Sequence, residues 1–440
     1  IFFSHPTPSP AMLRSLVGSE MCIRDSLFPV FMLVSLILSL INKKIRIGLT
    51  GRMRAYKQLQ VFMNNTEKNQ LIYWFHVASL GEYEQAKPII SGLKEVEPKA
   101  LFVMSFFSPS GYNNVDDDHI DCKIYLPLDF IWSIKKCLRL VKPKKLILAA
   151  YDVWPNLIWS ANSLGIHTSL FAATFSKKTS KSLFIIRQFY KSVYNAFSSI
   201  YTITKRDHEQ LIKILFPYEK PIIKALGNPR YDQVKQKSDK FTVERTISVL
   251  LRPKRLLIGS THLEDEDILL DPTIDLMNDI EDLSLLWAPH EPTKRNVARL
   301  KKYFSSKSVS TELLGIKNPN EINSKVIIVD SVGRLSQLYW DAQIAYLGGG
   351  FSTGVHNMME PAIARLPIFF GPKYHNFPEA IELIKVGGGF PIENGRDFSL
   401  GIKNLLEDNN LFLNASYAAT DVIHRNLGSS TRIVRGIIHD

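Results

Sequence analysis

The chain shows the same pattern twice: short apolar runs alternate with stretches of helical spacing. Such alternation predicts βαβ units and a parallel sheet in each half, and hence an α/β fold with two doubly wound, Rossmann-like domains. The expected strands of the first half are Leu71–Val77, Ala100–Phe106, Lys123–Leu126, Lys145–Ala149, His167–Ala172 and Ser199–Thr204. Those of the second half are Arg255–Gly259, Ser284–Ala288, Val326–Val329, Gln343–Leu347 and Pro367–Phe370.

The length of 440 residues is too great for one core and enough for two domains. A polar, lysine-rich stretch from Gln233 to Glu244 interrupts the alternation, and we interpret residues 229–250 as a linker. The expected N-terminal domain is then 43–228 and the expected C-terminal domain 251–440. The last helix is expected to be able to pack back on the N-terminal domain.

The first 42 residues are interpreted separately. Residues 1–26 are expected to be non-native or disordered, because Pro6 to Ser26 resembles a translated sequencing adapter. Leu27 to Ile41 has no charged residue, and a basic stretch from Lys43 to Lys57 follows. We expect a membrane-anchor helix at 27–42, with the body of the protein on the cytoplasmic side of the membrane. As a helix this run is roughly 22 Å long, short of a full span. A signal-peptide core and a buried helix are the alternatives, and the basic residues that follow the run argue against a signal peptide.

Charge and cysteine content narrow the possible partners. The net charge of +12 favours an acidic partner, such as nucleic acid, anionic lipid or a phosphorylated substrate. The sequence has no recognisable nucleic-acid-binding motif, so we expect no nucleic acid. Cys22, Cys122 and Cys137 form neither a zinc-ligand spacing nor a disulfide framework, which fits a reducing compartment.

A carboxylate follows the first expected strand of the N-terminal domain. Glu82 comes directly after Ser79-Leu80-Gly81, where the strand ends and a helix begins. Ligands of open α/β sheets bind at this edge, and a carboxylate there can take a proton from a substrate hydroxyl. It can equally stabilise the N-terminus of the helix. Asp152 follows a later strand of the same domain and has the same two interpretations, acid–base chemistry or helix capping.

The second half contains a dense glycine block from Gly348 to Pro361. Glycines allow a ligand to approach the backbone closely, and a following helix N-terminus would favour a phosphate group. Glu360 is placed to accept hydrogen bonds from ribose hydroxyls. The alternative is a glycine turn with a helix cap. The loops at 259–262, 288–292 and 330–335 also follow expected strands, so together they predict a nucleotide pocket. His262 and His290 lie in two of these loops and His356 in the glycine block, but their spacing predicts no metal site.

These motifs together resemble the 3-deoxy-D-manno-octulosonic acid (Kdo) transferases of lipopolysaccharide assembly. The residues that carry the resemblance are Ser79–Glu82, Ser105–Tyr112, Tyr125–Asp129, Trp154–Asn156, Gly227–Asp232, Gly348–Pro361, Gly371-Pro372 and Asn376-Phe377. The resemblance implies a GT-B glycosyltransferase with two domains facing a cleft. Such an enzyme moves Kdo from CMP-Kdo to a lipid A precursor (lipid IVA) with inversion, and it uses no metal and no cofactor. The implied partners are CMP-Kdo, the lipid A precursor and anionic inner-leaflet lipids.

The resemblance also implies roles for particular residues. Glu82 stands where the family has its general base, and Asp152 and Arg230 stand where it has transition-state stabilisers. The implied nucleotide-binding residues are Pro289, His290, Val332, Gly333, Arg334, Gly349, Gly350, Asn357, Met358, Met359 and Glu360. The sequence departs from the family at four of these positions: Asp152 replaces Glu, Arg230 often Lys, Pro289 often Arg, and Arg334 often Glu.

Three other functions stay open on the sequence alone. One is another GT-B transferase, or an epimerase that acts on a UDP-sugar. The others are a membrane-tethered binding protein without catalytic activity and an inactive transferase-like scaffold.

Overall fold

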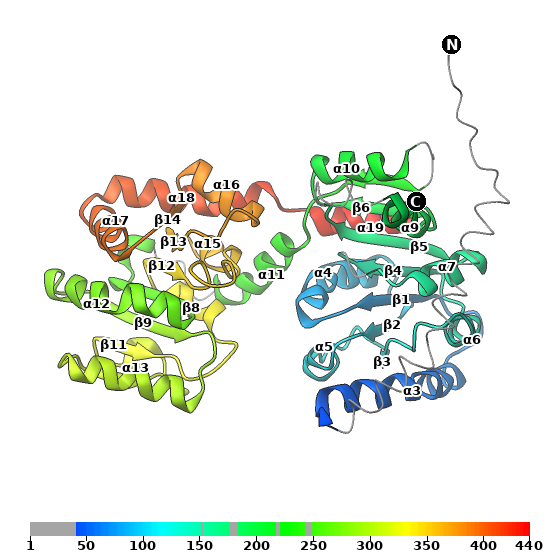
Figure 1. Ribbon diagram of the computed structural model, residues 1–440, viewed down its shortest axis with the longest axis horizontal. Coiled ribbons are helices and arrows are strands. Elements are labelled where there is room, and N and C mark those ends of the chain that lie inside the picture. Colours follow the sequence, from blue (N-terminus) through cyan, green and yellow to red (C-terminus); the bar gives the residue numbers. More distant parts are fainter. Residues whose placement is uncertain (1–40, 151–152, 176–183, 217–220, 243–247) are drawn as a thin grey trace, which may run out of the picture. The chain divides into compact units, whose positions relative to one another are not determined.

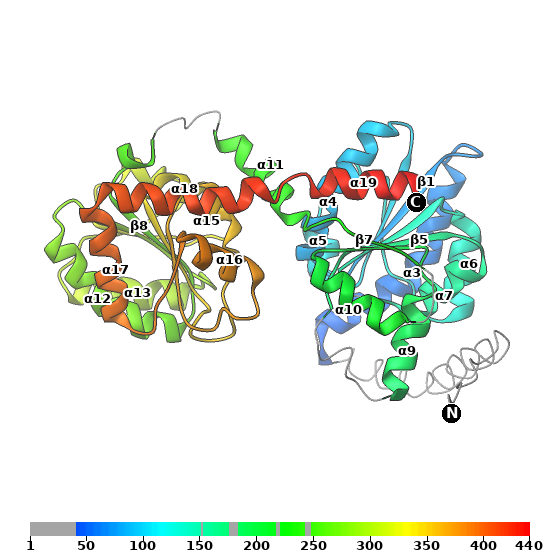
Figure 2. The same cartoon turned by 90° about the horizontal axis from the view of Figure 1, so that it is seen from above.

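The computed structural model describes residues 41–150, 153–175, 184–216, 221–242 and 248–440. The chain divides into two compact units (Figures 1 and 2). The first unit contains the chain up to Arg230 together with Gly428–Asp440, and the second contains Tyr231–Leu427. Each unit is built around one seven-stranded parallel sheet.

The first unit alternates strands and helices throughout. Its strands are β1 (Ile72–Val77), β2 (Leu101–Phe106), β3 (Cys122–Tyr125), β4 (Lys145–Ala149), β5 (His167–Ala173), β6 (Ser199–Thr202) and β7 (Ile222–Ala225). Its helices are α3 (Lys43–Asn64), α4 (Leu80–Val96), α5 (Pro109–Asn114), α6 (Ile131–Val141), α7 (Pro155–Ser163), α9 (Phe184–Tyr194), α10 (Lys205–Leu215) and α19 (Ser429–His439). The order in the sheet is β3-β2-β1-β4-β5-β6-β7.

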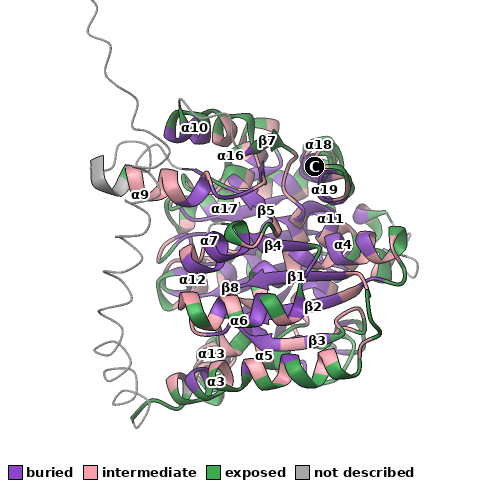
Figure 3. Cartoon of the chain, turned by 90° about the vertical axis from the view of Figure 1, so that its right-hand side faces the viewer, coloured by how far each residue is buried: buried purple, intermediate pink, exposed green. Residues whose placement is uncertain are grey.

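The two faces of this sheet have separate cores. Alternate side chains of β1 point to opposite faces, as the period of a strand requires. Tyr73, Phe75 and Val77 pack in one cluster with residues of α4 and α19, whereas Ile72 and Trp74 pack in the other with residues of α3, α6, α7 and α10. Figure 3 shows the central strands as buried and the helices as buried on one side only. This pattern is that of a doubly wound sheet.

The second unit begins with α11 (Arg230–Thr242), whose first residue, Arg230, still belongs to the first unit. Its strands are β8 (Arg255–Thr261), β9 (Ser284–Pro289), β10 (Thr311–Leu313), β11 (Val326–Ile328), β12 (Ile344–Leu347), β13 (Ile368–Phe370) and β14 (Gly389–Pro391). The other helices are η1 (Val249–Leu251), α12 (Leu263–Asp279), α13 (Lys294–Ser306), η2 (Pro319–Glu321), α14 (Leu335–Leu338), η3 (Tyr339–Asp341), α15 (Met359–Ile363), α16 (Pro378–Val386), α17 (Gly395–Glu407) and α18 (Asn409–Arg425). The sheet order is β10-β11-β9-β8-β12-β13-β14.

Three strands at sheet edges were not expected from the sequence: β7, β10 and β14. Each has at most four residues. All four side chains of β7 are half-buried or exposed, so its two isoleucines are too few to make the long buried apolar run of a central strand. An edge strand pairs on one side only, so its sequence is under weaker apolar constraint than that of a central strand.

Most of the segment expected to be a linker, 229–250, is a helix. Residues 230–242 form the helix α11, and Tyr231 and Val234 are buried in the core of the second unit. The chain passes between the units at Arg230 and again at Leu427. The lysines of the expected linker had indicated an exposed segment, but only part of the surface of α11 is polar.

The C-terminal helix α19 belongs to the first unit. Ile433, Val434 and Ile437 are buried beside α4 in the core on that face of the sheet. Gly436 lies so close to β6 that a Cβ there would be 2.8 Å from the Tyr201 ring. The Asp440 carboxylate accepts a hydrogen bond from Lys224 Nζ on β7 at 2.7 Å.

The expected anchor helix at 27–42 falls almost wholly outside the described residues, as do residues 1–26. Within the described part of the chain, no helix is both long and apolar enough to cross a bilayer.

Candidate functional site

Glu82 lies at the carboxyl edge of the first sheet, in the first turn of α4 just after β1. Its side chain is buried, and Oε2 accepts a hydrogen bond from the Ala78 backbone N–H at 2.5 Å. This hydrogen bond ties the side chain to the residue before the N-cap Ser79, so Glu82 has a structural role at the start of α4. Glu82 also places an acidic group at the edge where ligands of parallel α/β sheets bind.

The loop after β2 is tied to the loop of Glu82. Ser108 N donates to Ala78 O at 2.8 Å, and Phe107 N donates to Val77 O at 3.2 Å. Gly111 eases this approach, because a Cβ there would lie 3.3 Å from the backbone carbonyl carbon of Ser79. The motifs Ser79–Glu82 and Ser105–Tyr112 are thus neighbours in space.

Arg52 lies beside the loop after β2, and the sequence analysis did not include it among the site residues. Its guanidinium lies 4.3 Å from the centroid of the Phe107 ring, and Nη2 donates to Phe107 O at 2.8 Å. Trp154 also contacts Phe107, with a distance of 4.8 Å between the two ring centroids. Arg52 is on α3, far from these loops in sequence, so only the packing of α3 reveals its position.

The other two expected catalytic residues are on the same unit. Asp152 lies outside the described residues. The preceding Ala150 has a φ of 57°, a strained backbone conformation for a residue with a Cβ and one that collects at functional sites. Arg230 is half-buried at the first position of α11, and its backbone N–H donates to Asn228 Oδ1 at 3.1 Å.

In the second unit, three histidines meet at the carboxyl ends of adjacent strands. His262 follows β8, His290 follows β9, and His356 is in the glycine loop after β12; β8 lies between the other two strands in the sheet. The Nε2 atoms of His262 and His356 are 3.1 Å apart. The His290 ring stacks on both, at centroid distances of 4.5 Å and 4.6 Å. Burial, and then His290 and His262, lower the pKa of His356 to about 4.

Asp265 holds these loops together, and the sequence analysis did not single it out. Its carboxylate is fully buried and accepts hydrogen bonds from Gly349 N at 2.7 Å, His262 N at 2.9 Å and Tyr346 Oη at 2.9 Å. The available signal was the spacing of a capping box, in which Asp265 is the third residue of the helix after His262.

The glycine block is required by backbone packing at several positions. A Cβ at Gly348 would lie 2.7 Å from Thr261 Cα, and one at Gly350 would lie 2.6 Å from Gly371 Cα. Gly349 has a φ of 87°, in the left-handed region that favours glycine. These contacts explain the glycines without a ligand, and they bring the loop against His262.

The helix that follows the glycine block is too short for its N-terminus to attract a phosphate group as we predicted. α15 has five residues, and aligned peptide dipoles add up only along a longer helix. Met358 and Met359 are buried in the core, so only their backbone is available to a ligand. Asn357 Oδ1 accepts from Met359 N at 3.1 Å, and Glu360 Oε1 pairs with Lys237 Nζ at 2.8 Å.

The remaining expected nucleotide-binding residues differ in their surroundings. Pro289 is buried at the end of β9, beside His290. Val332 and Gly333 are exposed. The Arg334 guanidinium donates to Gly315 O at 2.5 Å and to Lys317 O at 3.0 Å, so it holds a neighbouring loop. Of the expected nucleotide-binding residues, His290 and Gly349 thus lie together with His262 and His356. Arg334 instead stabilises the loop at 315–317.

A family model and an individual relative both indicate similarity to the same group of transferases. Residues 48–233 match the family model of the 3-deoxy-D-manno-octulosonic-acid transferases (kdotransferase). A 3-deoxy-D-manno-octulosonic acid transferase of Haemophilus influenzae is 27% identical over 375 residues, which are 82% of this chain and 85% of that protein.

Solved structures show the same fold. A UDP-GlcNAc 2-epimerase from Neisseria meningitidis has a TM-score of 0.59 at 14% identity, covering 84% of this chain and 100% of that one. A glycosyltransferase from Rickettsia africae has a TM-score of 0.54 at 12% identity, again with 84% and 100% coverage. With its two seven-stranded parallel α/β units, the chain has the GT-B fold, and its sequence is similar to those of the Kdo transferases over most of its length.

Proposed function

We propose that the protein is an inverting glycosyltransferase that moves Kdo from CMP-Kdo to a lipid A precursor in lipopolysaccharide biosynthesis. The similarity to Kdo transferases over most of the chain supports the transferase activity. The observation that carries the mechanism is the buried carboxylate of Glu82 at the carboxyl edge of the first sheet.

In the proposed reaction, a hydroxyl oxygen of the acceptor attacks the anomeric carbon of Kdo. The bond from this carbon to the phosphate oxygen of CMP breaks, and its electron pair leaves with CMP. The hydroxyl proton passes to Glu82, which contributes roughly 10²–10⁴-fold as a general base. The nucleophile arrives opposite the leaving group, so the configuration inverts. Arg230 and Asp152 are the proposed stabilisers of the transition state.

The donor is proposed to bind to the second unit. His290, Pro289, Gly349 and Gly350 are the central contacts, with Val332, Gly333, Asn357 and the backbone at 358–359 around them. Glu360 Oε1 pairs with Lys237, and we assign the ribose hydroxyls to its second oxygen. CMP leaves as a phosphate monoester that backbone N–H groups and cations can stabilise. The proposed transfer step therefore needs no metal and no cofactor.

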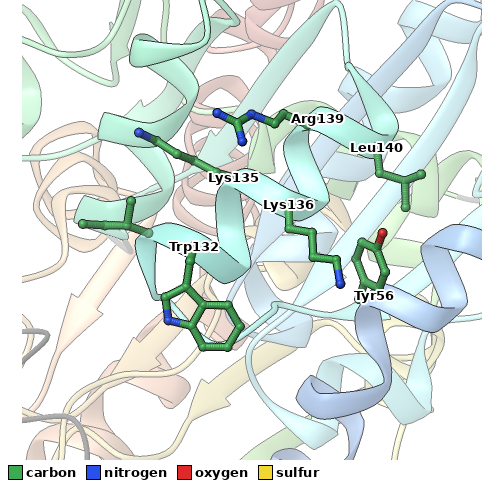
Figure 4. Close-up of a pocket in the computed structure, with 7 residues that line it drawn as sticks. Tyr56, Trp132, Lys135, Lys136, Arg139 and Leu140 are labelled. Carbon is green, nitrogen blue, oxygen red and sulfur yellow. The ribbon is translucent and has the colours of Figure 1, made fainter.

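A groove on the first unit supports an anionic lipid surface as a further partner. It is a hollow of about 590 Å³ lined by Tyr56 of α3 and by Ile131, Trp132, Lys135, Lys136, Arg139 and Leu140 at α6 (Figure 4). Trp132 is 68% exposed, and Lys136 Nζ lies 4.0 Å from the centroid of the Tyr56 ring. Exposed aromatic and basic side chains together are typical of surfaces that bind lipid headgroups. We propose that this groove and the expected anchor hold the protein on the inner membrane.

The test of activity is incubation of the full chain with CMP-Kdo and a tetraacyl lipid A precursor. We expect mass spectrometry to show a product heavier by one or more Kdo units. No transfer by folded protein would contradict the proposal. Calorimetry with CMP and with UDP separates the proposed function from a UDP-sugar enzyme of the same fold, since preference for UDP would exclude a CMP-sugar donor.

The lipid surface has its own test. The triple change Lys135→Glu, Lys136→Glu and Arg139→Glu should weaken binding to phosphatidylglycerol vesicles by about 1 kcal/mol for each basic residue. The control is Lys301→Glu with Lys302→Glu, two exposed lysines of α13 in the second unit. Equal vesicle binding by the two variants would contradict a role for the groove.

A further inference from the structure

The three histidines of the second unit have a geometry that the proposed transfer reaction does not use. They come from three loops, and their side-chain nitrogens offer ligand atoms that all lie within 4.8 Å of one another. We propose that His262, His290 and His356 bind a transition-metal dication of the Zn²⁺, Co²⁺ or Ni²⁺ class.

The distance between the first two ligands fits such an ion. The Nε2 atoms of His262 and His356 are 3.1 Å apart. Two imidazole nitrogens on a tetrahedral Zn²⁺ lie about 3.3 Å apart, since each Zn–N bond is about 2.0–2.1 Å. The separation of the nitrogens therefore fits to within a few tenths of an ångström. The two rings must also turn, because their Nε2 atoms now face each other with the ring centroids 5.3 Å apart.

The hydrogen bond between the rings of His262 and His356 must break when an ion binds. One Nε2 carries a proton and the other accepts it, and the ring planes differ by only 3°. An ion between them requires both Nε2 atoms to present lone pairs. Both rings then carry their proton on Nδ1, which is the ordinary neutral tautomer for an Nε2-bound metal. The ion replaces one hydrogen bond with two coordinate bonds.

The backbones of all three histidines are fixed by hydrogen bonds. His262 N donates to Asp265 at 2.9 Å, His290 N donates to Thr261 O at 3.0 Å, and His356 N donates to Gly348 O at 3.4 Å. A Cβ at Gly349 would lie 3.2 Å from the His356 ring, so the glycine makes room for it. The ligand positions are therefore held before an ion arrives, which lowers the entropy cost of binding.

His290 completes the site by a side-chain rotation. Its ring now stacks on the other two, whereas a ligand ring must point a nitrogen at the ion. The residue is exposed, so it can turn without disturbing the core. The exposed side of the cluster leaves a fourth position for water.

The chemistry of the ligands selects the class of ion. Three imidazoles suit Zn²⁺, Co²⁺, Ni²⁺ and Cu²⁺, whereas Mg²⁺ and Ca²⁺ prefer oxygen ligands. Both oxygens of the Asp265 carboxylate already accept hydrogen bonds from these loops and from Tyr346. It therefore positions the histidines and is not itself a ligand.

One consequence rests on the proposed function. His290 is also assigned to the cytidylate, so the ion and the donor should compete for the same site. Zn²⁺ should then raise the apparent Kd for CMP in the full chain, and CMP should weaken Zn²⁺ binding to the same degree, as linkage requires.

The test uses the full chain without a histidine tag, after removal of metal by a chelator. Calorimetry with ZnCl₂ should give one saturable site per chain, and Co²⁺ should give visible absorption bands of tetrahedral nitrogen coordination. The variants His262→Gln and His356→Gln should each weaken Zn²⁺ by at least the roughly 100-fold that loss of a supporting group costs. His424→Gln, an exposed histidine at the end of α18, should bind as the unchanged chain does.

The same variants show whether the site is real. His290→Gln changes an exposed side chain, so it tests the ligand set even if a variant at His262 or His356 fails to fold. Saturable binding that is equal in His290→Gln and His424→Gln, or no saturable binding by the unchanged chain, would overturn the proposal. Zn²⁺ binding without competition by CMP would retain the metal site and remove the assignment of His290 to the donor.

Discussion

The replacement Glu82→Gln separates the two roles that the structure leaves to this carboxylate. Glu82 Oε2 accepts the Ala78 N–H at the start of α4, so part of its effect is structural. Glutamine keeps an oxygen acceptor of the same reach and removes the charge. It therefore retains the cap but cannot take a proton from the acceptor hydroxyl.

The two effects differ enough in size to be distinguished. Loss of a general base should lower the rate of transfer by about 10²–10⁴-fold, which is roughly 2.7–5.4 kcal/mol in activation free energy. Loss of the charge at the helix N-terminus costs about 0.3–1 kcal/mol, and the weaker hydrogen bond costs about 1 kcal/mol more. With a typical unfolding free energy of about 5–15 kcal/mol, the variant stays folded.

The assay is single-turnover transfer with enzyme in excess over the lipid acceptor, so that product release does not hide the chemical step. Glu84→Gln is the matched control, because Glu84 lies two residues further along the same helix. Far-ultraviolet circular dichroism and chemical denaturation measure the folded fraction of each variant. A rate for Glu82→Gln within about threefold of the control, which is under 1 kcal/mol, would refute the base role and leave only the cap.

Three further predictions address the architecture. Asp265→Asn should lower the unfolding free energy of the second unit by about 1–3 kcal/mol, because the amide turns a donor toward N–H and O–H donors that the carboxylate satisfies; Asp267→Asn, an exposed site on the same helix, should change it little in the same denaturation experiment. Burial lowers the pKa of His76 to about 3, so its neutral form stabilises the fold above the unfolded pKa of about 6.5 and this stability is lost as the pH falls toward 3. Between pH 7 and pH 5 the loss should be about 2 kcal/mol by denaturant titration, and His76→Asn should abolish that pH-dependent part. Ile437→Ala should destabilise the first unit by about 2–5 kcal/mol, while the exposed Arg435→Ala should not; no difference between them in denaturation would contradict the packing of α19 on that unit.

Much of the fold follows from local sequence patterns. The central strands β1, β4 and β8 are apolar runs bounded by helical segments, and their bounds differ from expectation by two residues or fewer. The edge strands were missed because β7 has exposed side chains and β10 and β14 have three residues each. A segment of that length pairs because of its neighbours, not because of its own pattern.

Some residues of the candidate site were expected from the sequence, and others were found only in the structure. Glu82 follows directly from its position after a strand, and the glycine block after β12 was expected to be a ligand loop. The structure shows that Gly348 and Gly350 are also required by close backbone contacts. Arg52 could not be placed beforehand, because its partner Phe107 is distant in sequence, whereas Asp265 had a local signal in the capping-box spacing after His262.

The sequence by itself determined the alternation of strands and helices, and hence which residues stand at the carboxyl ends of parallel strands. It left open which of those ends are neighbours, because strand order depends on how helices pack on the two faces of a sheet. Only the order β9-β8-β12 brings His262, His290 and His356 together. Only tertiary packing returns α19 to the first unit, since its buried isoleucines are complementary to a face formed by residues at the other end of the chain.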